Sequence, residues 1–118
     1  MKIVYASRTG NVSQFIAKTG LTNTLEIKTG DEIVNEKFVL VTYTDGYGDL
    51  PEEVERFLPN NHDYLAAVAA SGDLSYGEAY ALAADVVSNT YGVPTILKFE
   101  FDGTNEDVEA FLDALNDL

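Results

Sequence analysis

Five apolar runs, each about as long as a β-strand, alternate with polar stretches along the chain. They are Lys2–Ala6, Thr24–Ile27, Phe38–Tyr43, Leu65–Ala70 and Thr95–Phe101. Phe38–Tyr43 is almost continuously apolar, which is typical of a parallel strand covered on both faces. The pattern therefore predicts five strands, at least one of which is buried on both sides.

Apolar residues at helical spacing fill most of the intervals between these strands. The predicted helices are Asn11 to about Thr19, one that begins at Pro51, about Glu78 to Thr90, and a terminal one after Thr104. Their predicted buried residues are Val54, Phe57 and Leu58 in the second, Leu82, Ala83 and Val86 in the third, and Val108, Phe111, Leu112 and Leu115 in the last. The polar interval Lys28–Lys37 predicts a loop without a helix. Alternating strands and helices predict an α/β fold, a parallel sheet with helices on both faces, and we expect residues 1–118 to form one domain.

Three glycine-containing loops follow three of the predicted strands. They are Ser7–Val12, Thr44–Leu50 and Ser71–Gly77. The carboxyl ends of parallel strands lie at one edge of the sheet, and ligands of open α/β sheets bind there. We therefore expect these loops to converge on a single site.

The first loop has the chemistry of an anion site. Ser7 and Thr9 carry hydroxyl donors, and Gly10 lets the backbone approach a ligand closely. The helix that follows offers free backbone N–H groups and the positive end of its dipole. The loop lacks the Gly-x-x-x-x-Gly-Lys pattern of nucleotide hydrolases, so neither ATP nor GTP is expected. A capped helix with nothing bound would have the same sequence.

The other two loops each place a tyrosine beside a glycine, at Tyr47-Gly48 and Tyr76-Gly77. A flat aromatic ligand can stack on such rings. A phosphate at one end of the site and a planar ring at the other fit flavin mononucleotide (FMN). Each tyrosine taken alone is also compatible with an ordinary, partly buried aromatic residue.

The charge of the chain narrows the choice of partners. Twenty acidic and seven basic residues give the 118-residue chain a formal net charge of −13. Binding to nucleic acid or to an anionic membrane requires basic residues, so neither is expected. A basic protein partner is compatible with this charge, although acidity can also serve solubility alone.

The cysteine content and the length of the apolar runs indicate where in the cell the protein is expected. The absence of cysteine excludes disulfides, thiolate chemistry and cysteine-ligated metals. No apolar run approaches the ~20 residues of a membrane span, and the N-terminus lacks a signal-peptide pattern. We expect a soluble, cytoplasmic protein.

An ordered set of motifs resembles the NrdI family, the flavodoxin-like partners of class Ib ribonucleotide reductase. The matching segments are Ser7–Val12, Val41–Thr44, Gly46–Gly48 with Pro51, Ala69–Gly72, Tyr76-Gly77, Val93-Pro94, Lys98–Glu100 and Gly103-Thr104. The similarity extends over nearly the whole chain. The missing helix between the second and third strands also resembles this family more than ordinary flavodoxins.

The resemblance implies a five-stranded parallel sheet of order 2-1-3-4-5 and one flavodoxin-like domain, residues 1–118, that binds FMN. It implies three partners: the metal-containing small subunit of the reductase, a reductase that reduces the flavin, and dioxygen. In the family, the reduced flavin reacts with dioxygen to supply an oxidant, described as superoxide, for radical generation. The flavin carries this chemistry, so we expect no catalytic side chain and no metal ligand.

The resemblance also implies the residues that hold the cofactor. The phosphate would contact Ser7, Arg8, Thr9, Gly10, Asn11 and Val12. The isoalloxazine ring would lie among Thr44, Asp45, Gly46, Tyr47 and Gly48 on one side and Ser71, Gly72, Asp73, Tyr76 and Gly77 on the other. The chain departs from the family pattern at Asp45 and Asp73, where uncharged residues are common, and at Tyr76, where tryptophan is common. Both carboxylates are expected to make the flavin harder to reduce to its anionic form.

Three other interpretations remain open. An electron-transfer flavodoxin would share the fold and cofactor but have another partner, and a binding module could have lost the cofactor. A response-regulator receiver has the same strand order, and Asp45 and Lys98 could supply two of its functional residues. However, no carboxylate follows the first strand to bind its Mg²⁺.

Overall fold

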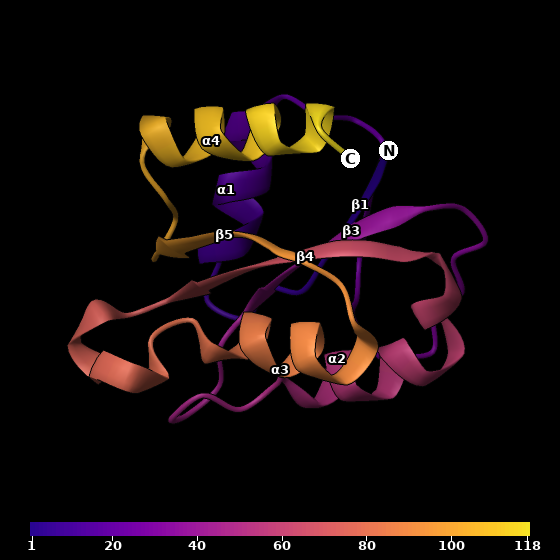
Figure 1. Cartoon of the computed structure of the whole chain (residues 1–118), viewed down its shortest axis with the longest axis horizontal. Coiled ribbons are helices and arrows are strands. Elements are labelled where there is room, and N and C mark those ends of the chain that lie inside the picture. Colours follow the sequence, from indigo (N-terminus) through magenta and orange to yellow (C-terminus); the bar gives the residue numbers. More distant parts are fainter.

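The computed structural model describes residues 1–118 and contains a five-stranded, all-parallel sheet in the order β2-β1-β3-β4-β5 (Figure 1). The strands are β1 (Lys2–Tyr5), β2 (Thr24–Glu26), β3 (Phe38–Tyr43), β4 (Leu65–Gly72) and β5 (Thr95–Glu100). The α-helices are α1 (Asn11–Thr19), α2 (Glu52–Phe57), α3 (Leu82–Tyr91) and α4 (Asn105–Asn116). Three 3₁₀ turns are η1 (Leu58–Asn60), η2 (His62–Tyr64) and η3 (Leu74–Ala79). The predicted fold class and strand order are confirmed.

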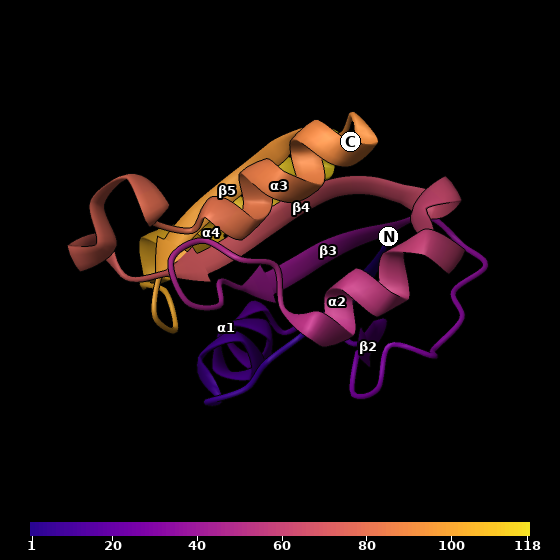
Figure 2. The same cartoon turned by 90° about the horizontal axis from the view of Figure 1, so that it is seen from below.

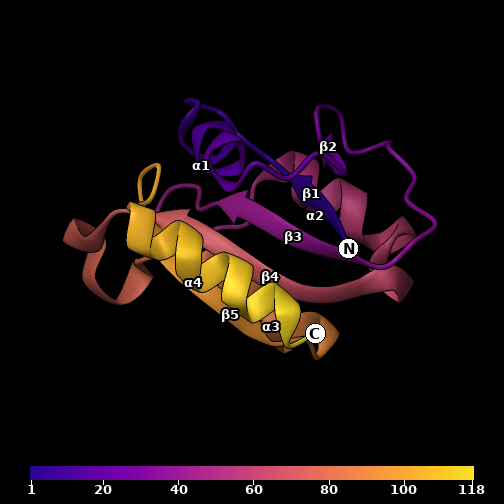
Figure 3. The same cartoon turned by 90° about the horizontal axis from the view of Figure 1, so that it is seen from above.

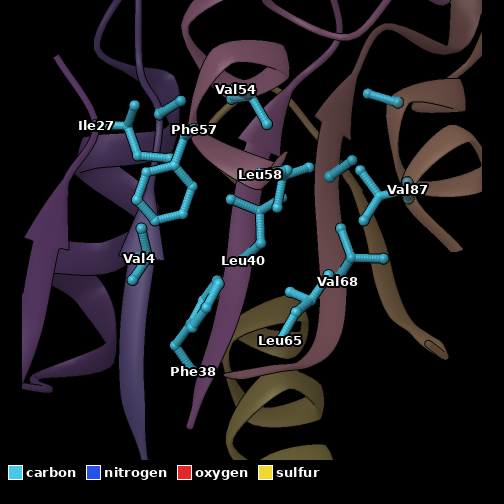
Figure 4. Packing of buried hydrophobic residues seen from close by; sticks show 14 of the residues in the cluster. Val4, Ile27, Phe38, Leu40, Val54, Phe57, Leu58, Leu65, Val68 and Val87 are labelled. Atoms are coloured by element: carbon cyan, nitrogen blue, oxygen red, sulfur yellow. The ribbon is translucent and has the colours of Figure 1, made fainter. Parts of the chain in front are cut away.

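Two helical layers cover the sheet. Figure 3 shows α1 and α4 over one face, and Figure 2 shows α2 and α3 over the other. Under α1 and α4, the ring of Phe15 stacks on Phe99 with centroids 4.0 Å apart and meets Phe111 edge-on. Under α2 and α3, Phe57 packs edge-on against Phe38 within a second cluster of aliphatic side chains (Figure 4). Both faces of the sheet are therefore buried, as the apolar sequence of β3 predicts.

The loop between β2 and β3 has no helix, as predicted, and hydrogen bonds give it a fixed shape. The carboxylate of Glu32 accepts hydrogen bonds from the backbone N–H groups of Lys28 (2.8 Å), Thr29 (3.1 Å) and Gly30 (2.9 Å). Partial burial raises the pKa of Glu32, but these backbone donors outweigh it and lower the pKa to about 2. The backbone of the loop thus stabilises the Glu32 carboxylate, and these hydrogen bonds hold the loop in one conformation without a helix.

A buried asparagine holds the same loop against α2. Asn61 is 1% exposed; its side-chain oxygen accepts a hydrogen bond from the N–H of Val34 at 2.7 Å. Its amide group donates to the carbonyls of Glu32 and Phe57. The end of α2 is thereby tied to the segment that leads into β3.

For the third helix, the prediction is wrong in the residue at which the helix starts and in the side chains that it buries. The chain forms η3 first, turns at Gly77, and begins α3 only at Leu82 instead of Glu78. Val86 is exposed, whereas Ala84 and Val87 join Ala83 in the core and Leu82 is half-buried. Alanine-rich segments carry little information about helical phase because alanine suits both faces.

Four strand ends also differ from the prediction: β1 and β2 each end one residue earlier, at Tyr5 and Glu26, and the other two differences bear on the site. β4 extends to Gly72, so Ser71 and Gly72 belong to the strand and not to the loop. β5 ends at Glu100, and Phe101 lies beyond it with a positive φ of 52°. All four differences occur at the carboxyl edge, where the chain leaves the sheet.

Candidate functional site

The start of α1 presents free backbone donors at the carboxyl end of β1. Gly10 is the N-cap residue, with φ 94°, a left-handed conformation that favours glycine, and it has no side chain to cap the helix. Ser7 instead braces the first turn, because its Oγ accepts a hydrogen bond from the N–H of Ser13 at 3.2 Å. The Ser13 hydroxyl contacts both Ser7 Oγ and the carbonyl of Gly10. This turn has the form of an anion cradle.

The loop after β3 is a tight turn closed by its own backbone. Asp45 and Asp49 exchange N–H···O bonds of 2.8 and 2.7 Å. Gly48, with φ 109°, packs so closely on Leu82 that an added Cβ would lie 2.5 Å from Leu82 Cδ2. The turn therefore needs glycine at this position, and it leaves Tyr47 81% exposed.

Hydrogen bonds link the ends of β3, β4 and β5. Thr44 Oγ1 donates to the carbonyl of Ser71 at 3.0 Å, and Ser71 Oγ donates to the carbonyl of Phe101 at 2.6 Å. The N–H of Phe101 returns to the carbonyl of Gly72. These bonds hold Phe101 in its positive-φ conformation, which is uncommon for a bulky residue.

A cavity of about 580 Å³, including its open mouth, lies among these strand ends. The space within it that water-sized molecules can occupy is about 120 Å³, below the ~300–1,000 Å³ usual for cofactor sites, so a cofactor would extend into the open mouth. Its walls are Ser7, Arg8, Thr9, Asn11, Val12, Tyr43, Thr44, Ser71, Gly72, Asp73, Tyr76, Ala79 and Phe101. All three loops singled out in the sequence thus contribute to one cavity, together with a fourth from β5.

The predicted site residues divide into those that line the cavity and those that do not. Ten line it: Ser7, Arg8, Thr9, Asn11, Val12, Thr44, Ser71, Gly72, Asp73 and Tyr76. Six lie in the same loops but outside the lining: Gly10, Asp45, Gly46, Tyr47, Gly48 and Gly77. The glycines shape the turns, while Asp45 pairs with Arg8 and Tyr47 is 81% exposed.

Sequence reasoning missed three lining residues, Tyr43, Ala79 and Phe101. Phe101 could have been found, because it follows a strand that ends at the same edge as the other three. Tyr43 is the last residue of β3, and the sequence predicts it as part of that strand and not of the site. No signal in the sequence identifies Ala79.

The two tyrosines expected to stack on a ring contact each other. The ring centroids of Tyr47 and Tyr76 are 5.3 Å apart and the ring planes are tilted by 41°. Tyr76 is 47% exposed and lines the cavity, whereas Tyr47 lies outside it. The ring of Tyr76 therefore lies in the cavity wall, and the ring of Tyr47 packs beside it, outside the lining.

Arg8 is the single cationic side chain in the cavity wall. Its guanidinium lies 4.9 Å from the centroid of the Tyr43 ring, and its Nη2 is 3.0 Å from Asp45 Oδ1. The Tyr43 hydroxyl donates to Glu53 at 2.8 Å. Burial and the Glu53 carboxylate raise the pKa of Tyr43 to about 12, so this hydroxyl remains protonated at neutral pH.

Asp73 is the acidic side chain in the cavity wall. It is the N-cap residue of η3, and its Oδ1 accepts a hydrogen bond from the N–H of Ser75 at 2.9 Å. Hydrogen bonds from the Ser75 side chain and backbone lower the pKa of Asp73. The carboxylate is therefore ionised at neutral pH, and no cationic side chain pairs with it.

A second, more open and polar cleft lies on the other side of Arg8 and Tyr43. Its walls are Ser7, Arg8, Lys28, Thr29, Tyr43, Asp45, Glu52, Glu53 and Arg56. Ser7, Arg8 and Tyr43 line both the cavity and this second cleft, so they form the partition between them.

Elsewhere, the pairing of Lys98 argues against a receiver domain. Lys98 forms an ion pair with Asp85 of α3, while Asp45 pairs with Arg8. The two residues that a receiver would bring together are thus engaged separately.

No group of three or more histidine, aspartate or glutamate side chains is placed to hold a metal ion. No helix is long and apolar enough to cross a membrane.

An all-parallel 2-1-3-4-5 sheet with a cavity at its carboxyl edge is the flavodoxin-like fold, and solved flavodoxin structures share it. A short-chain flavodoxin associated with a PDU bacterial microcompartment has a TM-score of 0.72 at 23% identity, over 98% of this chain and 95% of that one. The flavodoxin of Streptococcus pneumoniae TIGR4 has a TM-score of 0.67 at 26% identity (98% and 94%). Oxidised flavodoxin 1 from Bacillus cereus has a TM-score of 0.62 at 22% identity (96% and 92%).

The sequence identifies the family within this class. The model of the family described as "NrdI Flavodoxin like" matches residues 3–113. The chain belongs to this family.

Proposed function

We propose that this chain binds FMN in the cavity and activates the metal-containing small subunit of a class Ib ribonucleotide reductase. The observation that carries the proposal is the single cavity in which an uncapped helix start meets an aromatic wall. Membership of the NrdI family supports the choice of partner.

The residues present fit a flavin nucleotide. The hydroxyls of Ser7 and Thr9 and the free N–H groups at the start of α1 would hold the phosphate. The rings of Tyr76 and Phe101 offer apolar faces for the isoalloxazine. The Thr44–Gly48 turn stands beside them, and its glycines permit the backbone to approach a ligand closely.

The protein's own groups would bind and orient the cofactor and limit the access of water. When bound, FMN supplies the redox chemistry, taking electrons from a reductase and passing them to dioxygen to supply an oxidant, superoxide, to the partner. No side chain in the cavity is arranged as a nucleophile with an adjacent base, so no catalytic residue is assigned.

An activation assay tests the proposal. The FMN-loaded protein, reduced without oxygen, is mixed with the small subunit of a class Ib reductase that contains manganese, and dioxygen is then admitted. We expect the radical signal in electron paramagnetic resonance to appear only when the flavoprotein, the small subunit and dioxygen are all present. A colourless protein that takes up no FMN would refute the proposal.

A general electron-transfer flavodoxin is the second candidate, because the structural neighbours are flavodoxins. It predicts FMN binding and reduction of small electron acceptors without radical formation in the small subunit. The same assay therefore separates the two functions.

A further inference from the structure

The charge balance of the cavity poses a problem for a phosphate ligand. The chain carries a net charge of −13, and the cavity wall contains one cation, Arg8, against the carboxylate of Asp73. A phosphate monoester brings a further charge of about −1.5 to −2 at neutral pH. Arg8 is thus the only side chain of the wall that can neutralise it.

In the present structure Arg8 is already engaged. Its guanidinium pairs with Asp45 at 3.0 Å while it lies over the Tyr43 ring. Both members of the pair are substantially exposed, with side-chain exposures of 57% and 41%. Such exposed pairs contribute little to stability and exchange partners readily.

Arg8 stands at the boundary between two environments. It lines the cavity on one side and the second cleft on the other, whereas Asp45 lines only the second cleft. A change of side-chain conformation can therefore bring the guanidinium from Asp45 to the cavity. Guanidinium binds phosphate through two parallel hydrogen bonds, which are stronger than one exposed contact with a carboxylate.

We propose that Arg8 exchanges Asp45 for the ligand phosphate, and that Asp45 thereby limits how strongly the cavity prefers a phosphorylated flavin. Asp45 is a positioning residue, since it acts through Arg8. The inference rests on the proposed function, because it requires a flavin that carries a phosphate.

The test compares FMN with riboflavin, the same ring system without the phosphate. Quenching of flavin fluorescence gives the two Kd values, and their ratio isolates the contribution of the phosphate. In Asp45→Asn, Arg8 no longer has a charged partner to leave, so we expect the preference for FMN to rise about twofold to fivefold. Because riboflavin carries the same ring, the ratio cancels any effect of the substitution on binding of the ring itself.

Two further variants separate the exchange from simple charge removal. Asp49→Asn removes the same charge from the same turn, at an exposed carboxylate without an ion pair; its FMN preference should match wild type. In Arg8→Met the preference for FMN should fall, and adding Asp45→Asn to that variant should cause no further change. Asp45→Ser provides a second replacement should the asparagine variant fail to fold.

Each contrary outcome has a distinct meaning. An unchanged or reduced FMN preference in Asp45→Asn overturns the exchange, as does an equal rise in Asp49→Asn or in the Arg8→Met background. A wild-type protein that binds neither flavin refutes the proposed function itself, and the inference falls with it.

Discussion

Gly48 shows how closely one residue couples the candidate site to the core. Its φ of 109° lies in the region that favours glycine, and its Cα packs against Leu82 at the start of α3. The turn that carries Tyr47 is therefore held by contact with a helix and not only by its own hydrogen bonds.

Replacing this glycine should destabilise the fold. We expect Gly48→Ala to lower the free energy of unfolding by about 2 kcal/mol, from backbone strain and displacement of the Leu82 side chain. Gly92→Ala is the matched control: its φ is 71°, and nothing lies within 4 Å of an added Cβ. It should cost about 1 kcal/mol from strain alone. Urea denaturation measures both, and equal losses would show that the Leu82 contact is unimportant.

Asp73 should tune the potential of a bound flavin. The sequence alone implicated Asp45 equally, but Asp45 pairs with Arg8, whereas Asp73 lines the cavity without a cationic partner. A carboxylate beside a bound flavin opposes the addition of an electron to it, because like charges repel, and solvent weakens this effect at an exposed group.

We therefore expect Asp73→Asn to raise the potential of the second one-electron reduction by tens of millivolts. Asp45→Asn should have a smaller effect, and Asp63→Asn, in η2 at the opposite end of the sheet, none. Spectroelectrochemical titration of the FMN-loaded variants gives the values. A potential in Asp73→Asn equal to that of wild type would contradict this assignment.

Among the elements, the loop between β2 and β3 shows how a segment without regular structure is ordered by charge. Glu32 gathers three backbone N–H groups, and Arg56 of α2 adds an exposed ion pair with Asp31 at 2.8 Å. Gly30 lies so close to α2 that an added Cβ would be 2.7 Å from the Cβ of Arg56. The loop thus packs directly on the helix.

The stabilisation by Glu32 should depend on pH in a defined direction. Its pKa in the folded state is about 2, against an ordinary value of 4.5. Its contribution is therefore fully present above pH 4.5 and is lost as the pH falls toward 2. We expect Glu32→Gln to lower the free energy of unfolding by about 2 kcal/mol at pH 7, with the difference from wild type shrinking below pH ~4.5.

Chemical denaturation from pH 7 down to the lowest pH at which both proteins fold measures this difference. Glu36→Gln serves as the control, because Glu36 makes only one exposed ion pair, with Lys2. A loss in Glu32→Gln that stays constant with pH would exclude the carboxylate charge as its cause.

The elements that were predicted well differ from the others in how clearly their sequences indicate which residues are buried. The almost unbroken apolar sequence of β3 fixes a buried strand, and the loops after β1, β3 and β4 follow from it and its neighbours. The start of α3 was missed because alanines give no phase and the turn at Gly77 is a matter of backbone conformation. The Arg8–Asp45 pair joins residues 37 positions apart, so it depends on packing that local patterns do not encode.

At the scale of the whole molecule, the candidate site is confined to one edge of the sheet. All four strand ends that line the cavity lie at the carboxyl edge, while η2 lies at the other end, directly before β4 begins. Cofactor binding is therefore expected to affect one end of the molecule.

The net charge of −13 should govern encounter with a basic partner. Association with the reductase small subunit should slow about tenfold or more as ionic strength rises from 0.02 to 0.3 M, because salt screens long-range attraction. Stopped-flow association rates test this, with dissociation rates expected to change less. An association rate independent of salt would show that the acidity serves only solubility.

The central claim, that the ends of β1, β3, β4 and β5 form an FMN site, is tested most directly by nuclear magnetic resonance. Adding FMN to ¹⁵N-labelled protein should shift the amide signals of Ser7–Val12, Thr44–Gly48, Ser71–Gly77 and Phe101. The signals of Asn60–Tyr64 should stay unchanged. An absence of shifts, or shifts confined to the second cleft at Lys28, Thr29 and Glu52, would contradict the account.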